Sequence, residues 1–232
     1  MIRPFLKREA VLSSRIEGTV TRLDELLRFE AQAESNTEID SDINEVLNYV
    51  TALDYGLLRL AEEMPLRLRL LQEIHEKLMW NVRGSDRRPG EFRKSNVLIA
   101  RPGQSPDEAR FVPPLHTELL PLLTDFEKFL NEPGDMPLVV QLALAHYQFE
   151  AIHPFTDGNG RIGRLLITLM LCERKCLPQP MLYLSAYFER HDAEYRDHLL
   201  SVSQRASWED WIAFFAGGII EQAHDSALRA AR

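Results

Sequence analysis

The chain has 232 residues, of which 45% are hydrophobic, and this suits one large globular domain or one domain with a small appendage. Its 35 acidic and 27 basic residues give a formal net charge of -8, and such an acidic excess disfavours non-specific binding to nucleic acid or to an anionic membrane. No apolar run approaches the length of a membrane span, and residues 1–9 lack the apolar core of a signal peptide. We therefore expect a cytoplasmic protein that binds neither nucleic acid nor membrane.

Helical periodicity dominates the chain. The first predicted helix covers residues 3–16 and stops near Gly18, and residues 21–24 resemble a capping box that opens a second helix to about residue 34. The apolar spacing predicts further helices over residues 39–62, 66–80, 115–130, 138–151, 161–175, 179–190, 192–205 and 208–228.

The segment 81–114 differs from the rest because it is rich in Gly and Pro. Two short runs in it, 96–100 and 110–112, favour β-strands, and the residues between them suit the turn of a hairpin. The sequence therefore predicts an all-α fold with one small β-hairpin.

The segment 153–164, which reads HPFTDGNGRIGR, carries the residues with chemical potential. Pro154 disfavours a helical backbone at His153, so the preceding helix should end there. Gly158 and Gly160 allow positive φ angles. The free amides of such a turn, followed by a helix N-terminus, form an anion-binding site.

Four side chains of this segment carry charge or protons. Arg161 and Arg164 lie three residues apart on the predicted helix, and two guanidiniums on one face suit a polyphosphate. Asp157 is a suitable ligand for a Mg²⁺ ion that bridges phosphate oxygens. His153 titrates nearest to neutral pH, so it is the natural general base for a hydroxyl nucleophile.

The segment 153–164 resembles the signature of the Fic (Fido) family, H-P-F-x-[DE]-G-N-G-R-x-x-R, and matches every specified position. Flanking residues 149–152, 165–166, 111–114 and 208–212 are also similar to the family. The resemblance implies a Fic-type helical domain whose β-hairpin is a flap over the site. It also implies a protein adenylyltransferase, which transfers AMP from ATP to Ser, Thr or Tyr hydroxyls of target proteins.

The resemblance implies a role for each functional residue of the loop. His153 would deprotonate the target hydroxyl, and Asp157 would hold Mg²⁺ between the α- and β-phosphates. Arg161 would stabilise charge on the β-phosphate side, and Arg164 would hold the γ-phosphate. The other expected nucleotide contacts lie in the loop, in the flap and at the adenine site: Gly158, Asn159, Gly160, Ile162, Gly163, Val97, Leu98, Ile99, Ala100 and Tyr195.

Two of these assignments have alternatives. Ile162 also suits core packing that holds the loop, and Tyr195 suits either the adenine site or the core. The family often has two adjacent tyrosines near the adenine, whereas here the second position is Arg196. This departure leaves the adenine contacts open.

Residues 13–18, SSRIEG, resemble the inhibitory motif [ST]-x-x-x-E-[GN] of Fic proteins with an N-terminal inhibitory helix. Glu17 falls at a predicted helix C-terminus before Gly18, which suits a left-handed cap. An anion there opposes the helix dipole by roughly 0.3–1 kcal/mol, which a cationic partner would offset. The resemblance implies that this partner is Arg164, whose γ-phosphate contact would then be lost.

The resemblance also bears on domains and partners. We expect residues 1–35 to form an N-terminal region with the inhibitory helix and residues 36–232 to form the catalytic domain. The flap edge suits pairing with an extended segment of a target protein; a plain surface hairpin is the alternative. A homodimer is left open.

Other functions remain open beside AMP transfer. Some relatives remove AMP, with the inhibitory glutamate positioning water, and others transfer phosphate or phosphocholine. The presence of both Arg161 and Arg164 favours AMP transfer from ATP. An alternative of another class is an ATP-sensing interaction module that binds ATP and labels no partner.

Overall fold

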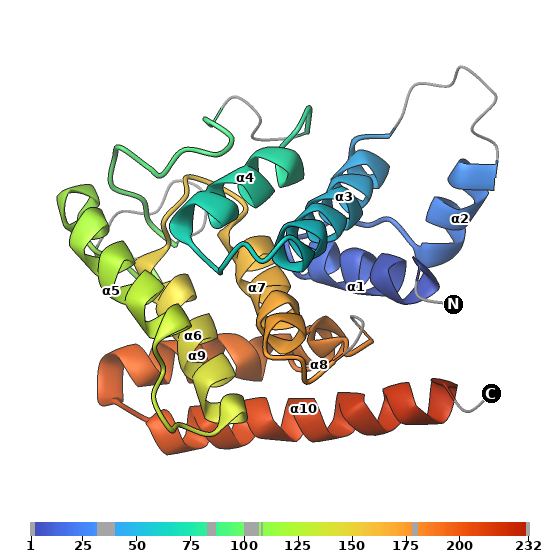
Figure 1. The fold of residues 1–232 in the computed structure, drawn as a ribbon. Coiled ribbons are helices and arrows are strands. Elements are labelled where there is room, and N and C mark those ends of the chain that lie inside the picture. Colours follow the sequence, from blue (N-terminus) through green and yellow to red (C-terminus); the bar gives the residue numbers. More distant parts are fainter. Residues whose placement is uncertain are drawn as a thin grey trace.

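The structure is a computed structural model that describes residues 3–31, 40–82, 87–99, 107, 109–177 and 181–230. In these residues the chain is all-α, with ten α-helices and one short 3₁₀-helix (Figure 1). The helices in chain order are α1 (Arg3–Ile16), α2 (Leu23–Ala31), α3 (Ser41–Ala61), α4 (Leu68–Leu78), η1 (His116–Glu118), α5 (Leu119–Asn131), α6 (Leu138–Ile152), α7 (Asn159–Glu173), α8 (Leu184–Arg190), α9 (Asp192–Arg205) and α10 (Trp208–Ala230).

Most of the predicted helices form close to their expected bounds. Two differ. α2 ends at Ala31, and residues 32–39 lie outside the described part of the chain. α8 begins at Leu184 rather than near residue 179. Two prolines of the sequence, Pro178 and Pro180, each disfavour a helical backbone at the residue before them, which accounts for the later start.

The predicted hairpin is reduced to one antiparallel bridge in the described residues, where no strand is found. Ile99 donates its N–H to the Phe111 carbonyl at 3.0 Å and accepts from the Phe111 N–H at 3.3 Å. Pro113 and Pro114 follow closely, and they have no N–H with which to extend the ladder. Most of the predicted turn, and Ala100 with it, lies outside the described residues.

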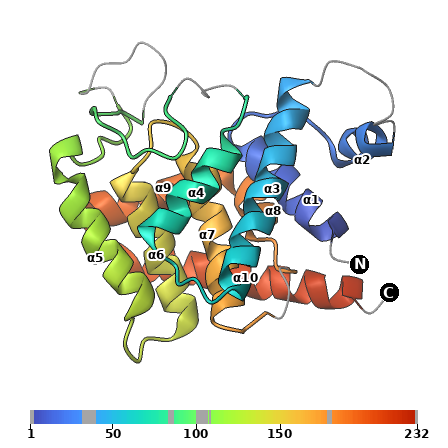
Figure 2. The ribbon, with the colours of Figure 1, turned by 45° about the horizontal axis from the view of Figure 1, so that its top comes forward.

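Helix α7 lies in the middle of the molecule, in contact with α1, α3, α4 and α6 (Figures 1 and 2). Its side chains are buried on all faces, among them Leu165, Leu166 and Leu169, as expected of a helix that is surrounded by others. The loop that precedes α7 is therefore held at the centre of the fold.

Helix α1 packs against α3 and α8 (Figure 2). It buries Leu6, Ala10 and Val11, and it ends beside the first turn of α7. Gly18 follows α1 with φ of 96°, and Thr19 donates to the Ser14 carbonyl, so the predicted left-handed cap is confirmed. None of the helices in the described ranges has the length and apolar character that a membrane crossing requires.

Candidate active site

His153 occupies the junction between α6 and the loop. The helix ends at Ile152, and His153 takes a left-handed conformation with φ of 51° and ψ of 61° while its N–H donates to the Phe149 carbonyl at 3.0 Å. A left-handed conformation is uncommon for a residue other than glycine. The predicted end of the helix at this residue is confirmed.

Arg93 holds the backbone around His153 in place. The Arg93 side chain is 4% exposed, and its Nε donates to the His153 carbonyl at 2.9 Å. Its Nη atoms donate to the carbonyls of Ser95 and Pro114, and its backbone N–H donates to the Pro154 carbonyl. One buried guanidinium thus satisfies carbonyls that would otherwise lack donors.

His75 of α4 supports the loop from the other side. Its ring stacks on Phe155 with centroids 3.8 Å apart. The Gly90 N–H donates to His75 Nδ1, so Nε2 carries the proton and donates to the Asp157 carbonyl at 3.0 Å. Burial lowers the pKa of His75 to about 4, so the ring is neutral near pH 7.

The loop also closes on itself before α7. The Asn159 side chain accepts from the Phe155 N–H and donates to the Phe155 carbonyl, both at 2.9 Å. Gly158 has φ of 76°, and a Cβ there would meet Met79 Sδ at 2.9 Å. The amides of the first turn of α7 have no partner within the helix, and they form an anion-binding end.

The imidazole of His153 lines a pocket with one ring nitrogen available as a base. Nδ1 lies 3.3 Å from the Glu150 carbonyl. Because a carbonyl only accepts, Nδ1 carries the proton and Nε2 keeps its lone pair. Burial lowers the pKa of His153 to about 4, which makes the neutral base the dominant form at pH 7.

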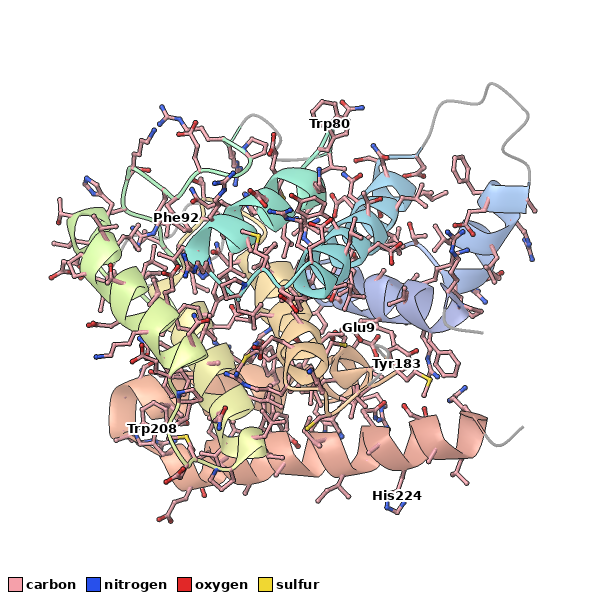
Figure 3. The ribbon with its side chains drawn as sticks, viewed as in Figure 1. Glu9, Trp80, Phe92, Tyr183, Trp208 and His224 are labelled. Carbon is pink, nitrogen blue, oxygen red and sulfur yellow. The ribbon has the colours of Figure 1, made fainter. Side chains whose placement is uncertain are left out.

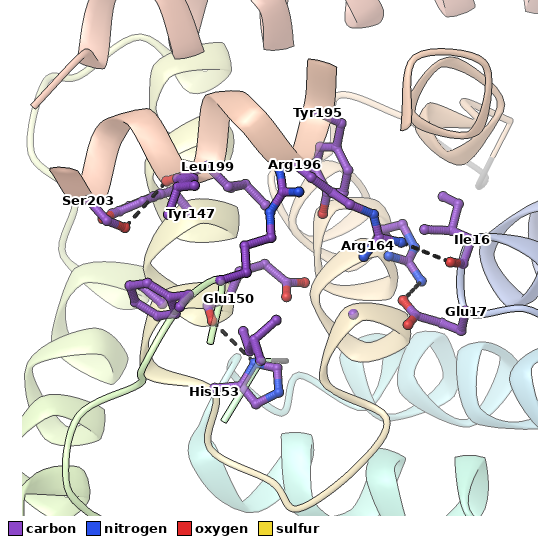
Figure 4. A pocket seen from close by; sticks show the side chains of 16 residues that line it. Ile16, Glu17, Tyr147, Glu150, His153, Arg164, Tyr195, Arg196, Leu199 and Ser203 are labelled. Atoms are coloured by element: carbon purple, nitrogen blue, oxygen red, sulfur yellow. Dashed lines mark hydrogen bonds and ion pairs between the residues drawn. The ribbon is translucent and has the colours of Figure 1, made fainter. Parts of the chain in front are cut away.

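The carboxylate of Glu17 lies over the first turn of α7 and pairs with Arg164. Arg164 is 2% exposed, and its Nη2 lies 2.6 Å from Glu17 Oε1 (Figure 4). The same guanidinium donates to the Ser13 hydroxyl and carbonyl, each at 2.9 Å. A Cβ on Gly160 would clash with Glu17 Oε1, so the missing side chain of this glycine makes room for the carboxylate.

The ion pair also sets the charge of Glu17. Burial, the largest single influence, would raise the pKa of this carboxyl, but Arg164 together with the charges of Arg161 and Arg196 outweighs it, and the pKa is lowered. Glu17 is therefore a carboxylate at the positive end of a helix dipole, where an anion is stabilised.

Arg161 and Asp157 lie on the opposite side of the loop. The buried Arg161 Nη1 pairs with Glu45 Oε2 at 3.2 Å, and its Nη2 lies 3.9 Å from Asp157 Oδ1. Asp157 Oδ2 pairs with the exposed Arg87 at 3.3 Å, and Oδ1 accepts from the Gly158 N–H. The Asp157 carboxylate thus stands between two guanidiniums with a third of its side chain exposed.

The pocket beside the loop gathers part of the predicted residue set. Its lining includes Glu17, Ile99, His153, Gly160, Arg164 and Tyr195. Ile162 is completely buried in the core, and a Cβ on Gly163 would clash with Glu150 rather than face the pocket. Val97 and the exposed Leu98 are not among the lining residues described.

Tyr195 both lines the pocket and packs in the core. It is 3% exposed, its hydroxyl lies 2.8 Å from His146 Nε2, and its ring stacks on Phe188. The next residue, Arg196, also lines the pocket, and its Nη2 donates to the Ile16 carbonyl at 3.0 Å (Figure 4). Arg196 thereby links α9 to the end of α1.

The lining also includes residues that were not predicted, among them Tyr147, Glu150 and Leu199. Tyr147 and Glu150 precede His153 by six and three residues on α6. That spacing on one helix face was the signal by which they could have been found.

A second buried carboxyl, Glu9, lies behind Arg164. It is 2% exposed and accepts from the hydroxyls of Ser185 and Tyr49. Burial raises its pKa to about 7. Tyr183, labelled beside it in Figure 3, has a raised pKa because of its own burial and then the charge of Glu9.

Comparisons with known proteins agree with this geometry. Residues 65–171 match the model of the Fic/DOC family, and residues 1–58 match the model of the Fic/DOC family N-terminal region. The chain is 34% identical over 130 residues to a protein adenylyltransferase Fic of Drosophila ananassae and 32% identical to that of Drosophila melanogaster, covering 55% of this chain. It spans only 24% of the length of these curated relatives.

Solved structures share the fold. A Fic family protein from Desulfovibrio desulfuricans superposes with a TM-score of 0.82 at 23% identity, over 99% of this chain and 66% of that chain. Fic-1 of C. elegans superposes with a TM-score of 0.72 at 21% identity, over 97% of this chain and 64% of that chain. With its central helix, its matched loop and its matched N-terminal segment, the chain is a Fic/DOC family protein with a Fic_N domain, distantly similar to Fic protein adenylyltransferases.

Proposed function

We propose that this protein transfers AMP from ATP to hydroxyl groups of a target protein, and that Glu17 holds the reaction in check. The observation that carries the proposal is the neutral His153 imidazole with its free Nε2, which lines the same pocket as the buried Arg164 at the first turn of α7. A base and a phosphate-binding end thus face one cavity.

The reaction needs the triphosphate on the first turn of α7 and the base of the nucleotide in the apolar part of the pocket. The target hydroxyl then approaches His153 Nε2, which accepts its proton. The hydroxyl oxygen bonds to the α-phosphorus, and the bond from that phosphorus to the bridging oxygen breaks, which releases pyrophosphate. Positioning and electrostatic stabilisation supply most of the rate in such transfers.

Mg²⁺ fits this site as an ion held mainly by the nucleotide. Among the described residues there is no group of three or more His, Cys, Asp or Glu that could hold a metal. Asp157 offers one partly exposed carboxylate, and its partner Arg87 is 53% exposed and free to turn away. Mg²⁺ takes one or two carboxylates together with phosphates and water, and when bound it neutralises phosphate charge.

Glu17 would limit the reaction by occupying the anion position. Its carboxylate lies against Gly160 and engages Arg164, the group expected to bind the γ-phosphate. A triphosphate that is denied both contacts binds without the geometry that in-line attack needs.

The bridge between Ile99 and Phe111 supports a docking place for the target. It holds one chain segment at the pocket rim, next to the exposed Leu98. An extended target segment that paired its backbone along residues 97–99 would bring its hydroxyl towards His153 whatever its own side chains are.

The test is labelling of proteins in a lysate with ATP that carries the label at the α or at the γ position. The variants are wild type, Glu17→Ala and Glu17→Ala/His153→Ala. Glu189→Ala is the matched control, because it removes a carboxylate that pairs with Arg15 of α1 at 3.3 Å and does not touch Arg164. We expect α-label only, raised by Glu17→Ala on the order of 10-fold or more, abolished without His153 and unchanged by the control.

Other outcomes point to other functions. Transfer of the γ-label indicates phosphate transfer. Loss of α-label from a previously labelled protein, dependent on Glu17, indicates removal of AMP. Nucleotide binding without any label, in a released variant, indicates a sensing module and contradicts the proposal. Self-labelling is separated by repeating the assay without lysate.

A further inference from the structure

Glu150 is the acidic side chain in the pocket that the proposed reaction does not use. It lies on α6, one turn before His153, and lines the same pocket. Its Oε1 is buried and has no hydrogen-bond partner in the described part of the structure. That oxygen lies against the Cα of Gly163, where any Cβ would clash with it. Glycine at 163 therefore makes room for a carboxyl rather than for a phosphate.

Two residues of α6 and the residue that follows the helix line the pocket in a row that suits the base, sugar and phosphate of a nucleotide. Tyr147, Glu150 and His153 are spaced by three residues, and all three line the pocket. Tyr147 and Glu150 lie on one face of α6, about 4.5 Å apart along its axis, and His153 follows directly after the helix. This step is close to the distance from base to sugar and from sugar to phosphate.

The two ends of this row differ in chemistry. The His153 end adjoins Gly160 and Arg164, which suit phosphates. At the other end Tyr147 lies beside Leu199 (Figure 4), and such side chains suit a planar base. Glu150 then stands beside the sugar.

The charges around Glu150 agree with a neutral donor rather than an anion as its ligand. Arg164 and Arg196 face it as cations, and Glu17 faces it as an anion. Burial raises the pKa of Glu150 to about 7, which Glu17 adds to and the two arginines oppose. Because Oε1 is enclosed against Gly163, the carboxyl would meet a ligand through its other oxygen. A carboxyl in a pocket wall suits hydroxyl donors, and carboxylates recognise ribose hydroxyls in this way.

We propose that Glu150 binds the hydroxyls of the ribose and makes the pocket selective for ribonucleotides over deoxyribonucleotides. The inference rests on the proposed function for the orientation of the nucleotide. Glu150 is a specificity-determining residue in this scheme, because it contacts the sugar and takes no part in the transfer.

The test measures binding without transfer, by calorimetric titration with the β,γ-imido analogues of ATP, 2′-deoxyATP and 3′-deoxyATP. The proteins are Glu17→Ala, Glu17→Ala/Glu150→Gln and Glu17→Ala/Glu150→Ala. We expect Glu17→Ala to prefer the ribose analogue to at least one deoxy analogue by roughly 10-fold. The preference should shrink with Gln, which keeps one acceptor, and disappear with Ala.

A matched control distinguishes recognition of the ribose by Glu150 from a purely structural role of Glu150 in the pocket. Glu17→Ala/Tyr147→Leu should weaken all three analogues by a similar factor and keep their ratio. If the Glu150 variants also weaken all three equally, or if Glu17→Ala shows no preference, the inference is overturned. Circular dichroism and the melting temperature of each variant exclude a folding defect.

The outcomes also distinguish this inference from the proposed function. If the Glu17→Ala protein labels proteins from α-labelled ATP but shows no ribose preference, the inference alone is refuted. If the Glu17→Ala protein shows the ribose preference but transfers no label, the transfer alone is refuted. If Glu17→Ala binds none of the three analogues, both are refuted.

Discussion

The loop of residues 153–164 and the C-terminal end of α1 meet at one pocket, but they are held in different ways. The loop is fixed by buried groups: Arg93 binds its first carbonyls, His75 stacks beneath it, and Asn159 closes it. The end of α1 is held by two arginines, and the Glu17 side chain is 34% exposed. Under the proposed function, this difference corresponds to a fixed catalytic loop beside an inhibitory contact whose carboxylate is reached by solvent.

The largest effect is expected when Arg93, which supports the loop of residues 153–164, is replaced. In the Glu17→Ala background, Arg93→Ala leaves several buried carbonyls without donors and frees the backbone of His153. We expect labelling to fall on the order of 100-fold, because a misplacement of about 1 Å costs this much, and unfolding free energy to fall by about 2–4 kcal/mol. The rate of α-label transfer and urea denaturation measure the two effects.

The control for this prediction is Arg69→Ala, which removes a 79% exposed arginine of α4. It should change neither quantity by more than its error. Full activity of the Arg93→Ala protein would contradict the view that this arginine positions His153.

A smaller effect is expected when the hydrogen bond that joins α9 to the end of α1 is removed. Arg196→Ala removes the hydrogen bond to the Ile16 carbonyl but leaves the pair of Glu17 with Arg164 intact. Labelling should rise roughly 2- to 10-fold, as expected for one hydrogen bond, and less than in Glu17→Ala. The exposed Arg190, which pairs with Glu221 on another helix, provides the matched Arg190→Ala control.

One result for Arg196→Ala would contradict this prediction. If labelling falls and the KM for ATP rises, Arg196 serves the nucleotide and not the end of α1.

The contribution of the buried Glu9 of α1 to the stability of the protein is expected to depend on pH. The pKa of Glu9 is raised from 4.5 to about 7, so the stability that its neutral form provides is complete below pH 4.5 and is lost as pH rises through 7. Glu9→Gln keeps the neutral form at every pH. We expect it to stabilise the protein by about 1–3 kcal/mol at pH 8 and by little at pH 5, as measured by urea denaturation.

Glu76→Gln, at an exposed position of α4, is the comparison for this measurement. An equal gain from Glu9→Gln at both pH values would show that the Glu9 carboxyl does not bind its proton more tightly in the folded state.

The smallest expected change concerns the charge of His153. Because burial lowers its pKa to about 4, the ring should stay neutral from pH 8 to pH 5. Removing Glu17 should lower the pKa further, since the charge of Glu17 raises it. Imidazole signals in an NMR titration, assigned with His153→Gln, measure this directly. A midpoint near 6.5, the ordinary value, would contradict the buried neutral base.

Much of the fold followed from local pattern. Helical spacing predicted the long helices, and the Pro-Gly chemistry of residues 153–164 predicted the end of α6 and the turn before α7. Of the predicted hairpin, the described residues contain one antiparallel bridge, and most of its turn lies outside them. β-favouring composition does not say whether neighbouring prolines allow a longer ladder. The start of α8 was missed because prolines restrict the residues before them.

The supports of the loop could not be predicted in the same way. His75, Arg93 and Glu45 are single residues far from the loop in sequence, and only the packing of α3 and α4 against α7 brings two of them to it. Arg93 donates to backbone carbonyls. Because every residue has one, the sequence does not indicate which carbonyls an arginine will bind. Glu150 was visible as part of a motif flank, but its unsatisfied oxygen appears only in three dimensions.

The clash that any side chain at position 160 would make with Glu17 has a kinetic meaning. A carboxylate in the place of a phosphate acts as a competitor that is attached to its own target, so its potency depends on an effective concentration set by the connection and not on the amount of protein. Inhibition of this kind does not change when the protein is diluted, and a higher nucleotide concentration competes with it. Under the proposed function, Glu17 would set a threshold, and the ATP level at which turnover begins would measure how tightly α1 is docked.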